Sequence, residues 1–330
     1  MIRIGILGAA RIAPRGIVTP ANDLLGVEVT AVASRELERA RTFASQHSIP
    51  LALGSYAELI ARDDIDLVYV PLPPSAHLQW CTAALASGKH VLVEKPFANN
   101  AQDAAQMAAA ARAAGKLLIE GFHYRFHPLF GQALAALRAG AIGRIRHIDA
   151  TFSATLPDTP GELRYIEELG GGALMDLGCY CVHWIRTVTG DEPSVVSASA
   201  QCGVPGVDID VEAQLAFTSG PTATLKCSMQ PEDGQLFRRL RVQGDRGVLE
   251  IDNPVTPHSG ATLVIESDKP SLPQIVSGGE TTFHHQLRHV LDCIAGRAQP
   301  LTGGEDAVAN MRAIDAIYRA AGLRPRGLSG

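Results

Sequence analysis

The chain has no excess of positive charge, no long hydrophobic run and only five lysines. Its 330 residues carry 29 Lys and Arg against 34 Asp and Glu, a net charge of −5. Because proteins that bind nucleic acid non-specifically need a basic surface, this balance argues against a DNA or RNA partner. The longest apolar stretches, such as residues 4–10, fall short of the roughly 18 residues of a membrane-spanning helix. We therefore expect neither a nucleic-acid nor a membrane partner.

The chain also has few cysteines, and no two of the six form a Cys-x-x-Cys pair. A chain of this size has enough apolar residues, 46%, to fold without disulfides, so we expect reduced thiols. Met1 leads directly into a β-type run, without the apolar segment and cleavage site of a secretory signal. These features predict a cytoplasmic location.

Metal-binding patterns are missing as well. The pairs His123/His127 and His285/His289 have helical spacing but lack the accompanying carboxylate of a zinc motif, so we predict no metal site. Three acidic residues alternate at the start of a predicted strand, which predicts that they lie on its solvent face. They are Asp208, Asp210 and Glu212.

Short apolar runs alternate with helical patterns over the first 120 residues. The predicted strands are 2–7, 27–33, 66–70, 90–93 and 117–120, and the predicted helices are 12–22, 36–47, 56–61, 76–87 and 101–114. Nearly continuous apolar strands separated by helices are typical of a parallel sheet that is covered on both faces. We therefore predict an α/β fold whose N-terminal domain, residues 1–122, is a doubly wound parallel sheet of the Rossmann type.

The pattern changes to long strands with alternating polarity from residue 123 onward. The predicted strands are 144–155, 194–201, 211–217, 222–229, 238–243, 248–252 and 261–267, and the predicted helices are 128–139, 173–189, 283–295 and 305–321. Glycine and proline separate the strands, as they do in antiparallel sheets. Residues 123–330 are predicted to form a C-terminal α+β domain with a large, mainly antiparallel open sheet.

The first predicted strand ends in a turn of small residues, Gly8-x-Ala10-x-x-Ala13. In dinucleotide-binding turns, small residues permit a tight turn, a close approach of the pyrophosphate and close packing of helix on strand. The second glycine of that pattern is missing here, and an ordinary strand-to-helix turn is the alternative. We predict that the backbone of this turn binds the pyrophosphate of a dinucleotide. The residues concerned are Gly8, Ala9, Ala10, Arg11 and Ile12.

The second strand ends in Ser34-Arg35, without the acidic residue that binds the ribose of NAD. A hydroxyl followed by a guanidinium suits the 2′-phosphate of NADP, because arginine makes bidentate contacts with phosphate. The predicted cofactor is therefore NADP(H) rather than NAD(H). Alternatively, Ser34 caps the next helix while Arg35 lies in solvent, and both roles can coexist.

Two further clusters follow. Glu94-Lys95-Pro96 ends the strand 90–93, at the edge of the sheet where ligands bind in this fold class. Gly170-Gly171-Gly172 precedes Asp176 and Tyr180, which are four residues apart and share a helix face. A solvated lysine, a helix-capping aspartate and a core tyrosine are the alternatives.

In this order and at these separations, the motifs resemble those of the Gfo/Idh/MocA family of oxidoreductases over essentially the whole chain. Many sugar and inositol dehydrogenases of that family have His where this chain has Tyr180. The tyrosine form resembles the branch that contains the dimeric dihydrodiol dehydrogenases and the NADP-dependent D-xylose 1-dehydrogenases. The resemblance implies an NADP-dependent oxidoreductase that acts on a sugar, a polyol or a vicinal diol.

The resemblance also implies roles for individual residues. Lys95 and Tyr180 would move the proton of the reacting hydroxyl, while Asp176 would orient the substrate. A lysine beside this tyrosine is chemically reasonable, because a nearby ammonium favours the phenolate form of tyrosine. From its position before the triple glycine, Arg164 is a candidate for binding substrate hydroxyls, with an exposed arginine as the alternative. Further candidates for cofactor binding are Pro71, His77, Glu94 and Arg125. For His77, the alternative is that its side chain faces the surface of its helix.

Alternative functions remain open. One is a reductase of a keto or dehydro sugar, which is the same chemistry in reverse. Another is a non-catalytic NADP-sensing protein, which would have no need for the set Lys95, Asp176 and Tyr180. From the resemblance and the open sheet we expect a homodimer or homotetramer.

Overall fold

The computed structural model describes residues 1–204, 206–267 and 274–328, and its contacts divide the chain into two compact units. The first unit contains residues 1–98, 102–123 and 283–308, and the second contains residues 99–101, 124–282 and 309–330. We predicted a cofactor domain, 1–122, and a substrate and assembly domain, 123–330. This division is defined by the functions of the two parts, so it stays a prediction. The compact units depart from it chiefly at residues 283–308.

That segment contains α8 (Thr282–Ile294), which packs against the N-terminal part of the chain. His284 Nε2 lies 2.9 Å from the carboxylate of Asp23, and the rings of Phe283 and His123 lie 4.1 Å apart. Because these contacts join positions more than 150 residues apart in the sequence, local patterns in the chain carry no sign of them.

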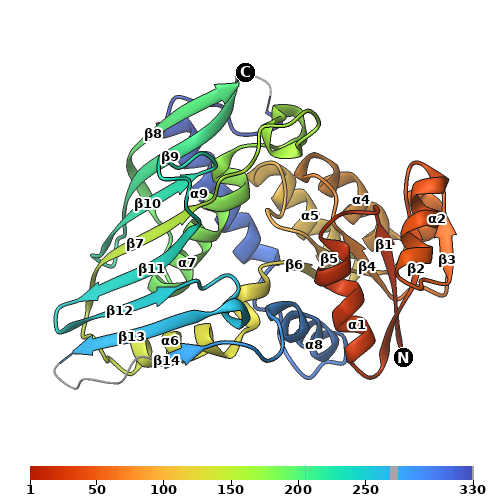
Figure 1. The fold of residues 1–330 in the computed structure, drawn as a ribbon, viewed down its shortest axis with the longest axis horizontal. Helices are drawn as coiled ribbons and strands as arrows, with labels where there is room; N and C mark the ends of the chain where they lie inside the picture. The colour runs from red at the N-terminus through yellow and green to blue at the C-terminus, as the bar shows by residue number, and fades with distance from the viewer. Residues whose placement is uncertain (205, 268–273, 329–330) are drawn as a thin grey trace. The chain divides into compact units, whose positions relative to one another are not determined.

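The first unit contains the predicted parallel sheet (Figure 1). Its strand order is β3-β2-β1-β4-β5-β6, the order of the Rossmann fold. The strands are β1 (Ile2–Leu7), β2 (Val27–Ala33), β3 (Leu51–Leu53), β4 (Leu67–Val70), β5 (His90–Val93) and β6 (Leu118–Glu120). Every residue of β4 and β6 is buried, so both faces of the sheet are covered there. This confirms the predicted fold of the N-terminal part.

The helices between these strands follow the prediction, except that the first of them is divided. They are α1 (Thr19–Asp23), α2 (Leu37–Gln46), α3 (Tyr56–Ile60), α4 (Pro74–Ala86) and α5 (Ala101–Ala114). The predicted helix 12–22 is divided, because a π-type turn over Pro14–Val18 precedes α1. Pro20 has no N–H to donate to the carbonyl of Gly16, which favours the wider turn. The strand β3, which is only three residues long, was not predicted.

The second unit contains an eight-stranded sheet of order β14-β13-β12-β11-β7-β10-β9-β8 (Figure 1). The strands are β7 (Ile145–Ser153), β8 (Ser194–Val204), β9 (Val207–Ala216), β10 (Thr222–Ser228), β11 (Phe237–Gly244), β12 (Gly247–Asp252), β13 (Ala261–Ser267) and β14 (Gln274–Val276). β7 and β10 pair in parallel, and the other neighbours pair antiparallel. The mainly antiparallel open sheet is therefore confirmed, and the short strand β14 is an addition.

One face of this sheet is covered by α7 (Cys179–Thr189). The inward residues of β7 are buried, and the ring of Phe152 stacks 6.3 Å from that of Trp184 on the helix. The remaining helices are α6 (Pro128–Arg138) and α9 (Gly304–Ala320), whose first five residues belong to the other unit. The layer between α7 and the sheet is the apolar core that positions the helix.

The prediction for Asp208 is wrong. Asp210 and Glu212 are partly exposed, as expected, but Asp208 is fully buried. The pairing of β8 with β9 shifts in register around Cys202, which faces Asp208, so the alternation of the strand is broken at that point. The buried carboxylate is bound by Arg326 and Tyr318 from the C-terminal end of the chain.

Candidate active site

The glycine turn at the end of β1 has the backbone geometry that only glycine adopts without strain. Gly8 has a φ of +106°, and its N–H donates to the carbonyl of Ala33 at the end of β2 (2.8 Å). A Cβ added to Gly8 would lie 2.9 Å from Leu72 Cδ2, in the loop after β4. β1 and β4 are the neighbours at which the strand order reverses, which is where ligands bind in such sheets. The tight turn, which leaves no room for a side chain at Gly8, therefore lies at the expected place.

Ser34 and Arg35 lie beside this turn, at the end of β2. Ser34 is buried and its Oγ accepts the N–H of Glu36 at 3.4 Å, just before α2, but the N-terminus of that helix has no side-chain cap. Arg35 is exposed. The contact uses the Ser34 hydroxyl and not the Arg35 guanidinium, so it is compatible with a phosphate contact of Arg35.

Two residues that were not predicted from the sequence lie beside this turn, Arg39 and Tyr56. Arg39 of α2 donates to the carbonyl of Ala9 at 3.1 Å, which brings a second guanidinium to the glycine turn. Burial raises the pKa of Tyr56, and the charges of Arg35 and Arg39 oppose that rise. Both guanidinium groups thus lie close enough to act on the same phenol. In the sequence, a second arginine four residues after Arg35 could have indicated the position of Arg39 beside this turn.

His77 does not face the helix surface, because its side chain is fully buried. Its approach to the cofactor stays a prediction. Its ring nitrogens lie 2.8 Å from the carbonyl oxygen of Leu72 and 3.2 Å from that of Phe97. Burial lowers the pKa of His77 to about 4, so the ring is neutral near pH 7 and donates to one of the two carbonyls. His77 joins the loop after β4, which includes Pro71, to the turn after β5.

The turn after β5 holds Glu94, Lys95 and Pro96, with a cis peptide between the last two. Glu94 is buried and its Oε1 accepts a hydrogen bond from Tyr69 at 2.6 Å. Burial raises the pKa of Glu94 above its ordinary value. Gly121 packs against this turn, and a Cβ there would lie 3.1 Å from the carbonyl oxygen of Val93. The backbone around Lys95 is therefore tightly held.

In the second unit, the glycine run leads into the segment that carries Asp176 and Tyr180. A π-type turn, Leu174–Gly178, contains Asp176 and continues into α7, whose second residue is Tyr180. The predicted helix 173–189 thus starts with a wider turn. Gly172 has a φ of +134°, and a Cβ there would collide with the carboxylate of Asp208. The conformation of the run depends on that buried carboxylate.

Arg164 interacts with Asp176. Its Nε donates to Asp176 Oδ2 at 2.7 Å, and another of its nitrogens donates to Glu162 at 2.8 Å. The carboxylates of Asp176 and Glu162 are 19% and 7% exposed, so water screens these pairs weakly. Arg164 therefore orients Asp176, a role that the sequence did not suggest.

Tyr180 is 4% exposed and lies among aromatic rings. The ring centres of Phe152, Tyr124 and Trp184 lie 5.6, 6.0 and 6.2 Å from that of Tyr180. Arg125, the neighbour of Tyr124, lies 5.9 Å above the ring of Phe130. The aromatic surroundings fix the ring of Tyr180, as a core tyrosine or a positioned proton donor requires.

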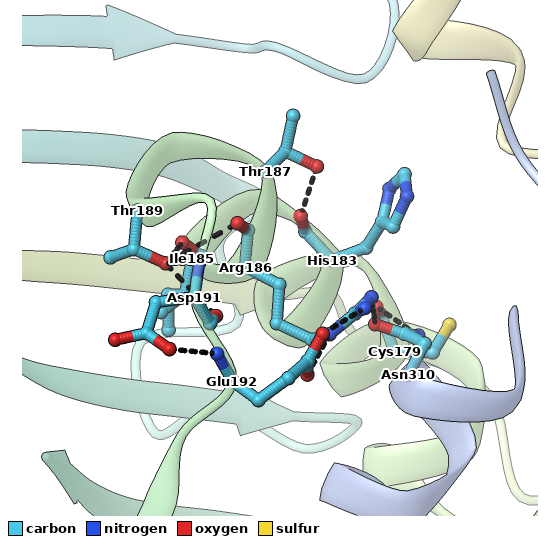
Figure 2. A network of polar contacts seen from close by, with 9 residues as sticks. All are labelled: Cys179, His183, Ile185, Arg186, Thr187, Thr189, Asp191, Glu192 and Asn310. Carbon is cyan, nitrogen blue, oxygen red and sulfur yellow. Dashed lines mark hydrogen bonds and ion pairs between the residues drawn. The ribbon is translucent and has the colours of Figure 1, made fainter. Parts of the chain in front are cut away.

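The far end of α7 is held by a network of polar contacts, drawn in Figure 2. Arg186 binds both carboxylate oxygens of Glu192, at 2.7 and 2.8 Å, and donates to Asn310 of α9 at 3.3 Å. Asn310 in turn donates to the carbonyl of Cys179, one residue before Tyr180 (3.4 Å). The network joins the first turn of α7 to its last turn, and so restrains movement of the helix along its axis.

The start of the same segment is held by Arg326. Its guanidinium donates to the carbonyls of Gly171, at 2.7 Å, and Gly206, at 2.6 Å, and binds Asp208. The other oxygen of Asp208 accepts the N–H of Leu174 at 2.7 Å. Arg326 and Asp208 are 1% and 0% exposed, and nothing in the sequence indicated that they meet.

Comparison with known proteins identifies the fold and the family. Residues 2–122 match the family profile described as oxidoreductase family, NAD-binding Rossmann fold, and residues 130–250 match the GFO/IDH/MocA C-terminal domain. The chain belongs to the Gfo/Idh/MocA family of oxidoreductases. The resemblance on which the sequence analysis relied is thereby confirmed.

Individual relatives cover nearly the whole chain. The chain is 35% identical to D-xylose 1-dehydrogenase (NADP(+)) 2 of Haloferax volcanii, over 96% of both chains. It is 33% identical to trans-1,2-dihydrobenzene-1,2-diol dehydrogenase of Xenopus tropicalis, over 81% of both. A crystal structure of a 3-ketoreductase from Actinomadura kijaniata with NADP and TDP-benzene is 30% identical over 98% of both chains, with a TM-score of 0.87. These relatives include the suspected branch.

Across residues 1–204, 206–267 and 274–328, His, Cys, Asp and Glu do not gather in any group of three or more that could hold a metal ion. Within the same residues, no helix has the length and apolar character needed to cross a membrane.

Proposed function

We propose that this protein is an NADP(H)-dependent oxidoreductase that transfers hydride between the nicotinamide and a carbon of a sugar, polyol or vicinal diol. The observation that carries the proposal is the near full-length similarity to an NADP-dependent xylose dehydrogenase. A diol dehydrogenase and a ketoreductase crystallised with NADP are similar as well. We further propose that it works in the cytoplasm as a homo-oligomer.

The residues of the first unit fit a dinucleotide. The turn at Gly8, whose backbone carries no side chain and has no room for one beside Leu72, suits a pyrophosphate. Arg35 and Arg39, beside the same turn, suit the 2′-phosphate that distinguishes NADP from NAD. Of the other candidates, His77 would act by shaping the loop after β4 and Glu94 by holding the turn of Lys95, because both side chains are buried.

The proton transfer is assigned to Lys95 and Tyr180. NADP(H), held at the turn of Gly8, would supply the hydride acceptor for the carbinol carbon in oxidation and the hydride donor in reduction. The phenolate of Tyr180 accepts the hydroxyl proton, so that a carbonyl group forms, and the ammonium of Lys95 stabilises the phenolate beforehand. Asp176, oriented by Arg164, accepts a hydrogen bond from a neighbouring substrate hydroxyl. In the reductive direction each transfer reverses.

Further structures of the ketoreductase support this assignment. They contain variants in which one tyrosine is replaced by phenylalanine and one lysine by alanine or glutamate. In that chain the two positions are separated by nearly the same number of residues as Lys95 and Tyr180 here. The same relative favours the reductive alternative, a ketone substrate, as the second candidate function.

The test is the variant Tyr180→Phe, compared with Tyr165→Phe. Tyr165 is also buried in the second unit, but its hydroxyl is bound by the carbonyl of Leu156 at 2.8 Å. We expect Tyr180→Phe to lower kcat at least about 100-fold, the scale of acid–base catalysis, with little change in NADPH affinity. Tyr165→Phe should keep its kcat. Turnover is followed by NADPH absorbance with a panel of aldoses, polyols and keto sugars, and affinity by NADPH fluorescence.

Two outcomes would contradict the proposal. Full activity of Tyr180→Phe would remove the proton-transfer role. Tight NADPH binding without turnover of any substrate, in either direction, would favour the sensing protein instead.

A further inference from the structure

Arg238 lies on the face of the second sheet that α7 covers. In the pairing of β11 with β7, Arg238 stands opposite Phe152, Leu240 opposite Ala150 and Val242 opposite Ile148. Directly paired residues point to the same side of a sheet, as do alternate residues of one strand. Apart from Arg238 these side chains are all buried. Arg238 therefore extends the inner, apolar face at the end where the ring of Phe152 lies 5.6 Å from that of Tyr180.

The two neighbouring arginines of β11 are in a different situation. Arg239 binds Asp252 at 2.8 Å and Arg241 lies 3.5 Å from Glu250, so each has a carboxylate to balance its charge. Within the described part of the chain no carboxylate lies within 4 Å of Arg238, whose hydrogen bond goes to the hydroxyl of Thr256 (2.8 Å). A partly buried guanidinium without a counter-ion costs free energy that the fold itself does not recover.

The electrostatics of Arg238 point to Tyr180. Burial lowers the pKa of Arg238, and the interaction that opposes this is with the negative form of Tyr180. Such an interaction is reciprocal, so the cation favours the phenolate. Arg238 remains protonated at every pH at which the protein is folded, and its effect is therefore constant.

Other titratable groups on the elements around α7 are already engaged or neutral. Tyr124 and His183 hydrogen-bond each other at 2.6 Å, and Asp176 is paired with Arg164. Burial raises the pKa of the thiols of Cys181 and Cys227, which keeps both uncharged. Among the described residues of this unit, Arg238 is a cation on the inner face of the sheet that no carboxylate balances.

We propose that Arg238 is a positioning residue for the reaction, which holds the phenolate of Tyr180 by its charge from the inner face of the sheet. The inference rests on the proposed function, because it assumes that Tyr180 transfers the proton. It explains why one arginine of three on β11 has no carboxylate partner: its partner is an anion that exists only when Tyr180 is ionised.

The test compares Arg238→Gln with Arg238→Lys and with the matched control Arg241→Gln on the same strand. Ionisation of Tyr180 is followed without substrate or cofactor, as the tyrosinate absorbance that Tyr180→Phe removes. We expect Arg238→Gln to raise the pKa of Tyr180 by about one unit or more, Arg238→Lys to restore most of the shift and Arg241→Gln to leave it unchanged.

A second readout is the pH profile of kcat/KM for oxidation. In Arg238→Gln the limb that requires the phenolate should move to higher pH by the same amount, with kcat near neutral pH lowered about tenfold. If the Gln variant does not fold, Arg238→Met, which keeps the length of the apolar stem, takes its place.

The outcomes separate this inference from the proposed function. Two results for Arg238→Gln would overturn the role of Arg238. One is an unchanged pKa of Tyr180 in the tyrosinate titration. The other is a higher KM without a shift in the pH profile of kcat/KM. Loss of turnover in Tyr180→Phe together with an unshifted titration in Arg238→Gln would leave the proposed function standing and remove only this inference.

Discussion

The guanidinium of Arg326, four residues from the C-terminus, binds the carboxylate of Asp208 in the interior of the second unit. The two residues meet at the base of the glycine run that leads to Tyr180. Arg326 also binds the carbonyl of Gly171, and Asp208 binds the N–H of Leu174. Burial raises the pKa of Asp208, and the charge of Arg326 opposes that rise. The C-terminal segment therefore helps to place the start of the proposed catalytic helix.

The first prediction concerns this pair. Arg326→Met leaves the Asp208 carboxylate buried without a counter-ion, so we expect a loss of about 3–5 kcal/mol in the free energy of unfolding. Adding Asp208→Asn removes the uncompensated charge, and the double variant should be less destabilised than the sum of the two single variants. Urea unfolding at neutral pH measures all three. Additive losses would show that the two side chains do not depend on each other.

The second prediction concerns the shape of the glycine turn. Gly8→Ala should weaken NADPH binding at least about tenfold, because the new Cβ meets Leu72 and displaces the backbone. Gly26 is the matched control, since it also has a positive φ, +82°, but open space around its Cα. Gly26→Ala should cost about 1 kcal/mol of stability through backbone strain and leave NADPH affinity unchanged. Equal affinities in the two variants would contradict the assignment.

The third prediction concerns cofactor choice. Arg35→Asp should weaken NADP binding far more than NAD binding, because a carboxylate repels the 2′-phosphate but accepts hydrogen bonds from a ribose hydroxyl. Arg39→Ala should weaken NADP binding in the same direction. Arg41, whose guanidinium pairs with Glu38 on the exposed side of α2, provides the control Arg41→Ala. Fluorescence titration with NADPH and NADH measures the ratio, and an equal loss for both cofactors would argue against the role.

The fourth prediction concerns acid stability. The pKa of His77 is about 4 in the folded protein and 6.5 in an unfolded chain. The unfolded state therefore binds more protons between these values, and stability falls as the pH decreases from about 6.5 to 4. This single group accounts for about 3 kcal/mol, full above pH 6.5 and lost below pH 4.

His77→Gln should flatten that part of the curve. Urea unfolding at several pH values between 4 and 7 gives the comparison. A wild-type slope in His77→Gln would mean that the buried ring is not the group that titrates.

How far the site could be predicted differs from residue to residue. Lys95 and Gly8 were placed correctly at the ends of strands, because a strand-end position follows from local patterns of apolar residues and glycine. Substrate binding by Arg164 stays a prediction, whereas its bond to Asp176, twelve residues away, was not predicted. That contact depends on the path of the loop between them, which no periodicity describes.

The same contrast holds for the three arginines of β11. The sequence shows Arg238, Arg239 and Arg241 as similar cations on one strand. The register with β7 decides that Arg238 lies beside Phe152 on the inner face, while carboxylates of β12 meet the other two. Register is set by the packing of the whole sheet, so the difference appears only in the folded chain.

By itself, the sequence determined the class of each half of the chain, most of the strands and helices, and the family, because hydrophobic period, glycine turns and short motifs act locally. The tertiary structure alone decided that Asp208 is buried, that Arg326 binds it from the end of the chain, and that His77 is enclosed by two loops. These are contacts between residues far apart in sequence or on separate loops. Their partners are chosen by packing and by the need to satisfy every buried charge and hydrogen-bonding group.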